Sequence, residues 1–159
     1  MAADEPRFEL GVAPARSAKQ RKRDALALLE REVDIWVASA SGDGEAMLVP
    51  LSFVWDGARL TISTPLGSKT ARNLIRAGAT RVALGATRDV VLIDGTIEVI
   101  KLGAEPELEE AHARATEFDP RTLAEEYVYL RITPDSIQAW REVNELAGRW
   151  VMRKGEWLG

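Results

Sequence analysis

Apolar and polar positions alternate with a period of two early in the chain, which is the pattern of half-buried β-strands. Residues 33–40 are rich in β-branched and aromatic side chains, and a run of turn residues follows them. Residues 46–55 alternate again, and Asp56 and Gly57 supply a tight turn into residues 59–64. The pattern therefore predicts a three-stranded antiparallel meander.

Helical signals occur at three other places. Ser17 followed by Gln20 forms a capping box, so a helix should begin there. A second helix is expected from about residue 69 to residue 77, with Gly78 as a left-handed C-cap. A third should start where Pro106 stands among several glutamates, because carboxylates suit the positive end of a helix dipole.

The rest of the chain again favours strands. Four further strands are expected, at residues 81–87, 89–101, 127–133 and 136–142. Gly95 falls in the middle of a long strand, which indicates a β-bulge. Pro134 and Asp135 are interpreted as a turn between the last two strands.

Six or seven strands against three helices, joined by short turns, predict a mainly β fold with peripheral helices. The best fit is a small antiparallel barrel. Residues 1–16 show no steady period and are expected to be a flexible arm. Residues 17–159 are expected to form a single domain.

Composition narrows the function classes. The 159 residues contain no cysteine, so disulfides and thiolate chemistry are excluded. No run approaches the roughly 20 apolar residues that span a bilayer, and the acidic start is unlike a secretory signal, so we expect a cytoplasmic protein that binds no membrane. A net charge of −4 argues against nucleic-acid binding, and the basic run at residues 19–23 is interpreted as a solvated helix face.

The catalytic inventory is sparse. His112 is the only histidine and lies among charged neighbours, so we expect it at the surface. The paired carboxylates Glu109/Glu110 and Glu125/Glu126 are interpreted as solvated positions. No G-x-S-x-G motif and no cluster of metal ligands is present, so the sequence supports neither a hydrolase triad nor a metal site, and its catalytic residues are unknown.

A phosphate site is indicated where residues 59–64 lead into the second helix. Ser68 and Lys69 would add a hydroxyl and an ammonium group to the unpaired N–H groups of a helix N-terminus, and Thr64 ends the preceding strand. The alternative is that Ser68 is only an N-cap and Lys69 only a surface residue.

Pro50 indicates an edge strand, because proline cannot donate to a neighbouring strand. The backbone near Pro50 could then bind a flat polar ring, although a role in packing alone is also compatible with the pattern. An anchored phosphate beside an open strand edge would suit a heterocycle on a phosphorylated side chain.

The run of residues 49–84, VPLSFVWDGARLTISTPLGSKTARNLIRAGATRVAL, resembles the pyridoxamine 5'-phosphate oxidase-like split-barrel flavoproteins, which include deazaflavin-dependent oxidoreductases. The resemblance extends over about residues 20–142. It implies a homodimer of split barrels, with a flavin-type cofactor in each of two grooves at the subunit interface.

The resemblance also implies which residues hold the cofactor. The phosphate would meet Thr64, Ser68, Lys69 and Asn73. The ring would face Pro50, Leu51 and Ser52. Across the dimer, the second subunit would contribute Arg88, Asp89, Trp140 and Arg141. The chain lacks the His/Arg-rich C-terminal signature of the true pyridoxamine phosphate oxidases, which argues against vitamin B6 oxidation.

The implied function is an oxidoreductase that uses FMN or the deazaflavin F420 on a small organic substrate. Such a cofactor carries the redox chemistry itself, which would explain the sparse catalytic inventory. The acidic tail of F420 would need extra cations, for which Lys69, Arg72, Arg76 and Arg88 are available, so both cofactors stay open. The alternative for these arginines is a solvated helix face. The alternative from another class is a non-catalytic protein that binds or carries a flavin, haem or similar planar ligand.

Overall fold

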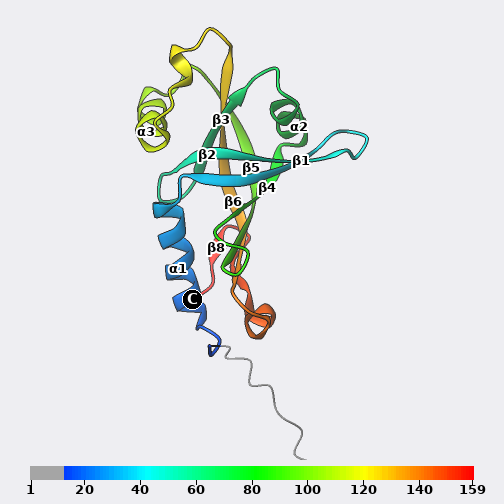
Figure 1. Cartoon of the computed structure of the whole chain (residues 1–159), viewed down its shortest axis with the longest axis vertical. Helices are drawn as coiled ribbons and strands as arrows, with labels where there is room; N and C mark the ends of the chain where they lie inside the picture. Colours follow the sequence, from blue (N-terminus) through cyan, green and yellow to red (C-terminus); the bar gives the residue numbers. More distant parts are fainter. Residues whose placement is uncertain (1–12) are drawn as a thin grey trace, which may run out of the picture.

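The computed structural model describes residues 13–159 (Figure 1). The helical elements are α1 (Ala18–Arg31), α2 (Lys69–Ala77), α3 (Pro106–Thr116) and the 3-10 turns η1 (Pro120–Thr122) and η2 (Val143–Gly148). The strands are β1 (Asp34–Ala40), β2 (Ala46–Trp55), β3 (Leu60–Pro65), β4 (Ala79–Leu84), β5 (Val90–Lys101), β6 (Tyr127–Trp140), β7 (Trp150–Arg153) and β8 (Glu156–Trp157).

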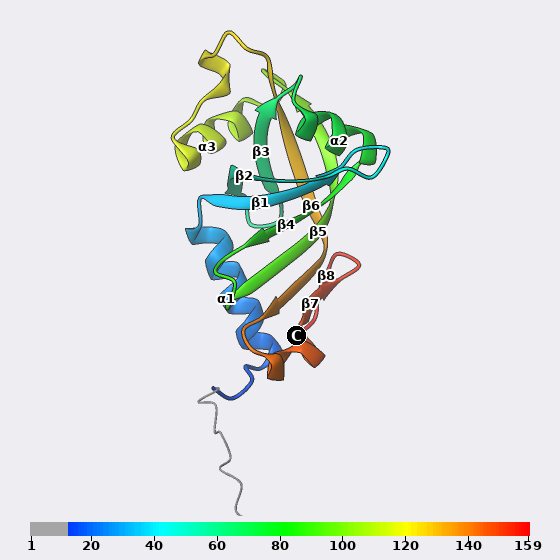
Figure 2. The same cartoon turned by 45° about the vertical axis from the view of Figure 1, so that its right-hand side comes forward.

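Six antiparallel strands close into a barrel in the order β3-β2-β1-β4-β5-β6, because β3 also pairs with β6. The hairpin of β7 and β8 extends the sheet beyond β6. Figures 1 and 2 show α2 and α3 on opposite sides of one end of the barrel, with α1 along the other end. The predicted mainly β split barrel with peripheral helices is confirmed, as is its opening meander of β1, β2 and β3.

The inward-facing side chains, at every second position of a strand, fill the barrel interior. On β6, Val128, Leu130 and Ile132 are buried and belong to the main apolar core. The intervening Tyr129 and Arg131 are buried as well, but they lie on the opposite face of the strand, outside that core. The barrel therefore has a second buried layer on its outer side.

The barrel is split beside β2. Residues 46–52 pair with β1 alone, whereas residues 53–55 pair with β3. Beyond that point β3 continues against β6, as far as Pro65 opposite Tyr127. Within residues 13–159, the first part of β2 thus has one free edge, as Pro50 predicted.

The bulge predicted at Gly95 is confirmed, but the turn predicted at Pro134 and Asp135 is wrong. The register between β5 and β6 shifts at Gly95, which pairs with Pro134, while the preceding Asp94 pairs with Ser136. Asp135 is the extra residue, and β6 runs through it without interruption. A bulge accommodates the missing N–H of proline, so a local turn signal was overridden by pairing with a distant strand.

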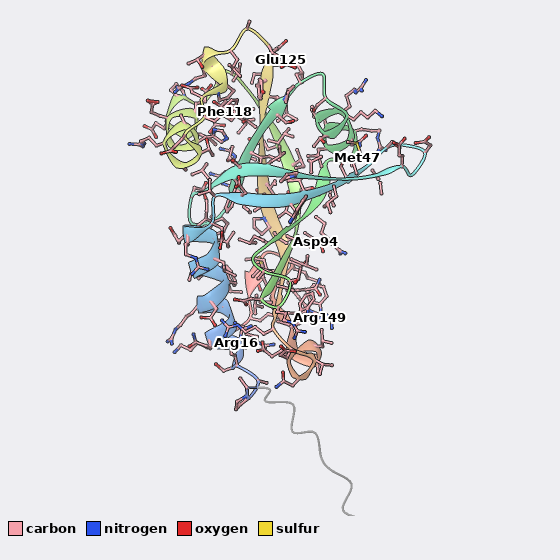
Figure 3. All side chains as sticks on the ribbon, viewed as in Figure 1. Arg16, Met47, Asp94, Phe118, Glu125 and Arg149 are labelled. Carbon is pink, nitrogen blue, oxygen red and sulfur yellow. The ribbon has the colours of Figure 1, made fainter. Side chains whose placement is uncertain are left out.

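The predicted helix start is confirmed with Ser17 as its N-cap, because the Ser17 hydroxyl accepts a hydrogen bond from the Gln20 amide at 3.1 Å. The Gln20 side chain donates to Asp24 at 2.9 Å, so the capping box is only half formed. Arg21 departs from the expected solvated face: it is buried and donates to the Glu145 carbonyl oxygen at 3.3 Å. Arg16, labelled at the base of α1 in Figure 3, pairs with Asp24 and with Glu145. Most of the arm predicted at residues 1–16 lies outside the described residues.

The surface position expected for His112 is wrong, and so is the solvated position expected for Glu109. Both side chains are 1% exposed, because one face of α3 packs on the outer side of the barrel. A Glu109 carboxylate oxygen accepts a hydrogen bond from the Gly103 amide at 2.7 Å, and the His112 ring meets the Tyr129 ring edge-on at 5.2 Å between centroids. The charged residues around Glu109 and His112 in the sequence gave no indication that this polar face of α3 is buried.

Neutral His112 should make the fold sensitive to acid. Burial lowers the pKa of His112 to about 4 from its ordinary 6.5, against an opposing attraction from Asp119. Between these values the folded state binds fewer protons than the unfolded state. The contribution is therefore complete above pH 6.5 and is lost as the pH falls towards 4, by about 3 kcal/mol.

Urea denaturation at several pH values from 7 to 4 measures this effect. The free energy of unfolding of His112→Leu is expected to fall less over this range than that of the unmodified protein, because leucine does not titrate. The carboxylates titrate in both proteins and so cancel in the comparison. An equal fall in both proteins would show that His112 is not buried in its neutral form.

Candidate functional site

The loop before α2 brings two hydroxyls together. Ser68 is the N-cap: its Oγ accepts a hydrogen bond from the Ala71 amide at 3.1 Å and lies 3.2 Å from the Thr64 Oγ1. Thr64 is buried at the end of β3, while Ser68 is half-buried and Lys69 exposed. A hydroxyl that accepts one hydrogen bond still has its own proton to donate, so Ser68 can serve as a cap and bind an anion as well.

The amides of Lys69 and Thr70 add two backbone donors to these side chains, because the amides on either side of them already have acceptors. The Ser68 amide donates to the Pro65 carbonyl oxygen, and the Arg72 amide begins the helical bonding by donating to the Ser68 carbonyl oxygen. The amides of Lys69 and Thr70 lie in the first turn, where a helix offers its N–H groups no internal acceptor. The start of α2 is thus a cradle of amides, a hydroxyl and an ammonium group.

A cleft of about 210 Å³ adjoins this cradle, lined by Lys69, Arg72 and Asn73 of α2 and by Ser41, Glu45 and Met47 of the β1–β2 hairpin. In Figure 3 the labelled Met47 lies beside α2. Asn73 is buried, and its amide nitrogen donates to the Ser39 Oγ at 3.2 Å and approaches the Met47 Sδ at 3.7 Å. In this structure Asn73 therefore fixes α2 against the hairpin.

The free edge of β2 presents backbone groups to the split. The Phe53 amide donates to the Val33 carbonyl oxygen at 2.8 Å, on the side of β1. Since successive residues of a strand direct their backbone groups to alternate sides, those of Pro50 and Ser52 face the free edge. Proline at position 50 therefore removes no hydrogen bond from the sheet, because its backbone nitrogen faces the free edge. The Ser52 hydroxyl itself donates to Asp34 at 2.6 Å.

The remaining predicted residues form a separate group at the far end of the barrel, composed of Arg88, Asp89, Trp140 and Arg141. Arg141 donates to Asp89 at 3.2 Å and lies 3.6 Å from Asp24 of α1, and Arg88 donates to Glu142 at 3.3 Å. The six residues of β4 carry the chain about 20 Å from α2 before this group begins. A single copy of the chain therefore does not bring the two groups together.

A model of the pyridoxamine 5'-phosphate oxidase family matches residues 22–141. The chain belongs to this family. The match includes α2, the free edge of β2 and all four residues of the distant group. The pyridoxamine 5'-phosphate oxidase family is flavin-binding.

Solved structures share the fold at low sequence identity. An F420 reductase is 18% identical with a TM-score of 0.58, the match covering 70% of this chain and 93% of the reductase. General Stress Protein 26 from Bacillus anthracis is 17% identical with a TM-score of 0.62, covering 75% and 92%. A pyridoxamine 5'-phosphate oxidase-related, FMN binding protein from Nostoc punctiforme is 16% identical with a TM-score of 0.51, covering 80% and 84%. No curated protein has a significantly similar sequence.

Sequence reasoning missed the wall of the cleft that the β1–β2 hairpin supplies. Ser41 and Glu45 belong to a turn, and nothing local indicates that this turn approaches α2. The signal that could have found them is Asn73, an amide on the otherwise apolar side of a short helix, which requires a polar partner from another element.

Proposed function

We propose that this protein is a flavin-dependent oxidoreductase that holds FMN or the deazaflavin F420 in a groove between two copies of the chain. The observation that carries this function is the cradle at the start of α2, which faces a cleft next to the free edge of β2. The small organic substrate would be oxidised or reduced at the exposed face of the cofactor ring.

The residues present fit the phosphate end of such a cofactor. The positive end of the α2 dipole, the amides of Lys69 and Thr70, the Ser68 hydroxyl and the Lys69 ammonium group all favour a dianion. The Thr64 hydroxyl lies within hydrogen-bond distance of the Ser68 hydroxyl and helps to hold it in place. Arg72 lines the same cleft and is available to the acidic tail of F420, so this end accommodates either cofactor.

The ring would lie along the free edge of β2, where the backbone groups of Pro50 and Ser52 are available. The distant group around Arg88 and Arg141 would complete the site from a second copy of the chain, since one copy does not bring the two groups together. A homodimer with two equivalent sites satisfies this geometry.

The bound cofactor would supply hydride or electron transfer, and the chain would bind and orient it and exclude water. This division of labour agrees with the absence of a nucleophile–base pair from the cradle. Under this proposal the protein's contribution to the rate lies in placing the ring against the substrate.

The absorption spectrum of freshly purified protein tests the proposal. We expect a flavin or deazaflavin chromophore, identified by mass spectrometry after release, or saturable binding when either is added. The reduced cofactor bound to the protein should then be oxidised faster by a panel of enone and quinone acceptors than the free cofactor is. Binding without such turnover would identify a cofactor carrier, and absence of flavin and deazaflavin binding would exclude both the oxidoreductase and a flavin carrier.

A further inference from the structure

The helices cover only part of the outer surface of the barrel. Apolar residues of α1 and α2 belong to the main core, so these two helices pack against the barrel interior. The third helix, α3, packs on the outer surface, where its His112 ring lies against the fully buried Tyr129. In Figure 1, β1 lies across the front of the barrel and no helix crosses it. Within residues 13–159, the outer surface around β1 is therefore left open.

The strand register shows which side chains share this surface. Ile35 and Val37 belong to the core, so Trp36, which lies between them, points outward. Its cross-strand partners are Pro50 on β2 and Ala83 on β4, and the same row continues across β5, β6 and β7. We define the open face as the outward side chains of residues 34–38, 48–52, 81–83, 90–94 and 136–140.

The open face is apolar and exposed. Trp36 is 49% exposed and Leu48 is 61% exposed, whereas Ile100 and Tyr129, on the part of the outer surface beneath α3, are buried. The other apolar members of the open face are all at least partly exposed, namely Pro50, Ala83, Val90, Leu92 and Trp140. A contiguous apolar surface of this kind indicates contact with another molecule.

The charged groups of the open face already have partners on it. Arg81 donates to the two carboxylate oxygens of Asp94, at 2.7 and 3.0 Å. Asp34 accepts a hydrogen bond from the Ser52 hydroxyl at 2.6 Å. Aromatic side chains combined with few free charges are typical of the core of a protein–protein interface. The open face therefore suits another protein surface.

The positions of the two parts of the candidate site favour a second copy of this chain as that protein. Pro50, at the free edge of β2, lies on one margin of the open face. Trp140, which belongs to the distant group, lies on the other margin at the end of β6. The strand order β2-β1-β4-β5-β6 places β4 midway between the two margins. A two-fold axis along β4 therefore sets the β2 margin of each copy against the β6 margin of the other.

Such an axis completes two equivalent sites at once. The same patch is used on both copies of an isologous interface, and the open face is one patch that carries both margins. The cradle and the free edge of each copy are then joined by the distant group of the other copy. A different protein would cover the apolar side chains but would leave both sites incomplete.

We propose that two copies of this chain associate through the open face, with a two-fold axis along β4 and with Trp36 and Leu48 in the contact. The choice of axis rests on the proposed function, because the cofactor groove is what needs both parts of the site. The exposed apolar surface itself does not depend on that function.

Size-exclusion chromatography with light scattering measures the association. At micromolar concentration we expect the unmodified protein to have a mass of about 35 kDa, twice the 17.5 kDa of one chain. Trp36→Asp should have the mass of one chain. Its dimer dissociation constant should rise at least about a hundredfold, because an aromatic anchor contributes strongly and each dimer loses two of them. Urea denaturation verifies that the variant remains folded, as expected for a residue that is exposed in a single copy.

Two exposed aliphatic residues form a matched pair of variants. Leu48 lies on the open face, whereas Val143, which is 76% exposed, lies on η2 away from it. Leu48→Asp should dissociate the dimer, because two carboxylates would be buried in the contact. Val143→Asp adds the same charge outside the contact and should leave the dimer intact.

A cross-link tests the position of the axis. The chain has no cysteine, so Ala83→Cys introduces a single thiol, on the strand that follows the proposed axis. Packed sheets lie about 10 Å apart, so a short bismaleimide should join two copies of this variant. Ala58→Cys, at an exposed position in the turn between β2 and β3, is the control and should be joined only at the level of random collisions.

The proposal is overturned if the unmodified protein has the mass of one chain or of more than two chains. It is also overturned if Trp36→Asp and Leu48→Asp both stay dimeric, if Val143→Asp dissociates as they do, or if Ala83→Cys is cross-linked no better than Ala58→Cys.

The cofactor is a separate readout. A dimer that behaves as expected but binds no flavin or deazaflavin would exclude the proposed function and leave the interface in place. A protein that binds a flavin, and whose dimer persists in both the Trp36 and the Leu48 variants, would exclude this interface and leave the function in place.

Discussion

Replacing Ser68 and Lys69 together by alanine is expected to weaken FMN and F420 binding about a hundredfold. The double variant removes a hydroxyl donor and an ammonium group from the phosphate, and a hydrogen bond to a charged group contributes about 1.5–3 kcal/mol. The amides of Lys69 and Thr70 remain, so weak binding should persist. Fluorescence titration with each cofactor measures the loss.

The chain contains a matched control for this experiment. Ser17 caps α1 as Ser68 caps α2, and Lys19 lies in the first turn of α1. The double variant Ser17→Ala, Lys19→Ala should lose similar helix-capping stability, about 1 kcal/mol, without losing cofactor affinity. Unchanged affinity in the Ser68, Lys69 variant, or an equal loss in both, would remove the basis for the proposed function.

Gly95→Ala is expected to destabilise the fold strongly. A Cβ at this position would lie 2.7 Å from the Ile132 Cγ2 and 2.7 Å from the Thr133 carbonyl oxygen, so the bulge between β5 and β6 would have to open. Overpacking of this kind costs about 1–3 kcal/mol, and the involvement of backbone places it at the upper end. Urea denaturation measures the loss.

Gly42→Ala is the corresponding control. A Cβ there would meet only Arg76, at 3.8 Å, which is an ordinary contact with a flexible side chain. Its free energy of unfolding should change by no more than about 0.5 kcal/mol. If Gly95→Ala is equally mild, the bulge is not as tightly packed as the structure indicates.

The wrong prediction of a turn at Pro134 and Asp135 and the wrong prediction of exposed positions for His112 and Glu109 have one physical cause. Pro134 and Asp135 are turn-formers by local preference, yet pairing with Asp94 and Gly95, some 40 residues earlier, makes them part of one strand. His112 and Glu109 are polar, yet α3 covers them because it has to bury one face against the barrel. In both cases contacts between distant segments outweighed local preference.

In the candidate site too, local signals predicted some features, and contacts between distant segments decided the others. Local capping signals are enough to predict α2, with Ser68 at its start and Gly78 in the left-handed conformation at its end. The edge position of Pro50 follows from its missing N–H. The approach of the β1–β2 hairpin to α2, and the separation of the Arg141 group from the cradle, depend on how the barrel closes.

The sequence by itself determined the strands of the opening meander, the starts of α1 and α2, and the hydroxyl and ammonium groups of Ser68 and Lys69 at the second of these starts, because periodicity, caps and turns act over a few residues. It did not determine that β6 is a single strand or that β7 and β8 form a hairpin. Only the tertiary structure decided that β3 closes the barrel against β6, that the closure leaves residues 46–52 with a free edge, and that the open face stays exposed. Those features depend on pairing between residues far apart in the chain, which short-range preferences do not specify.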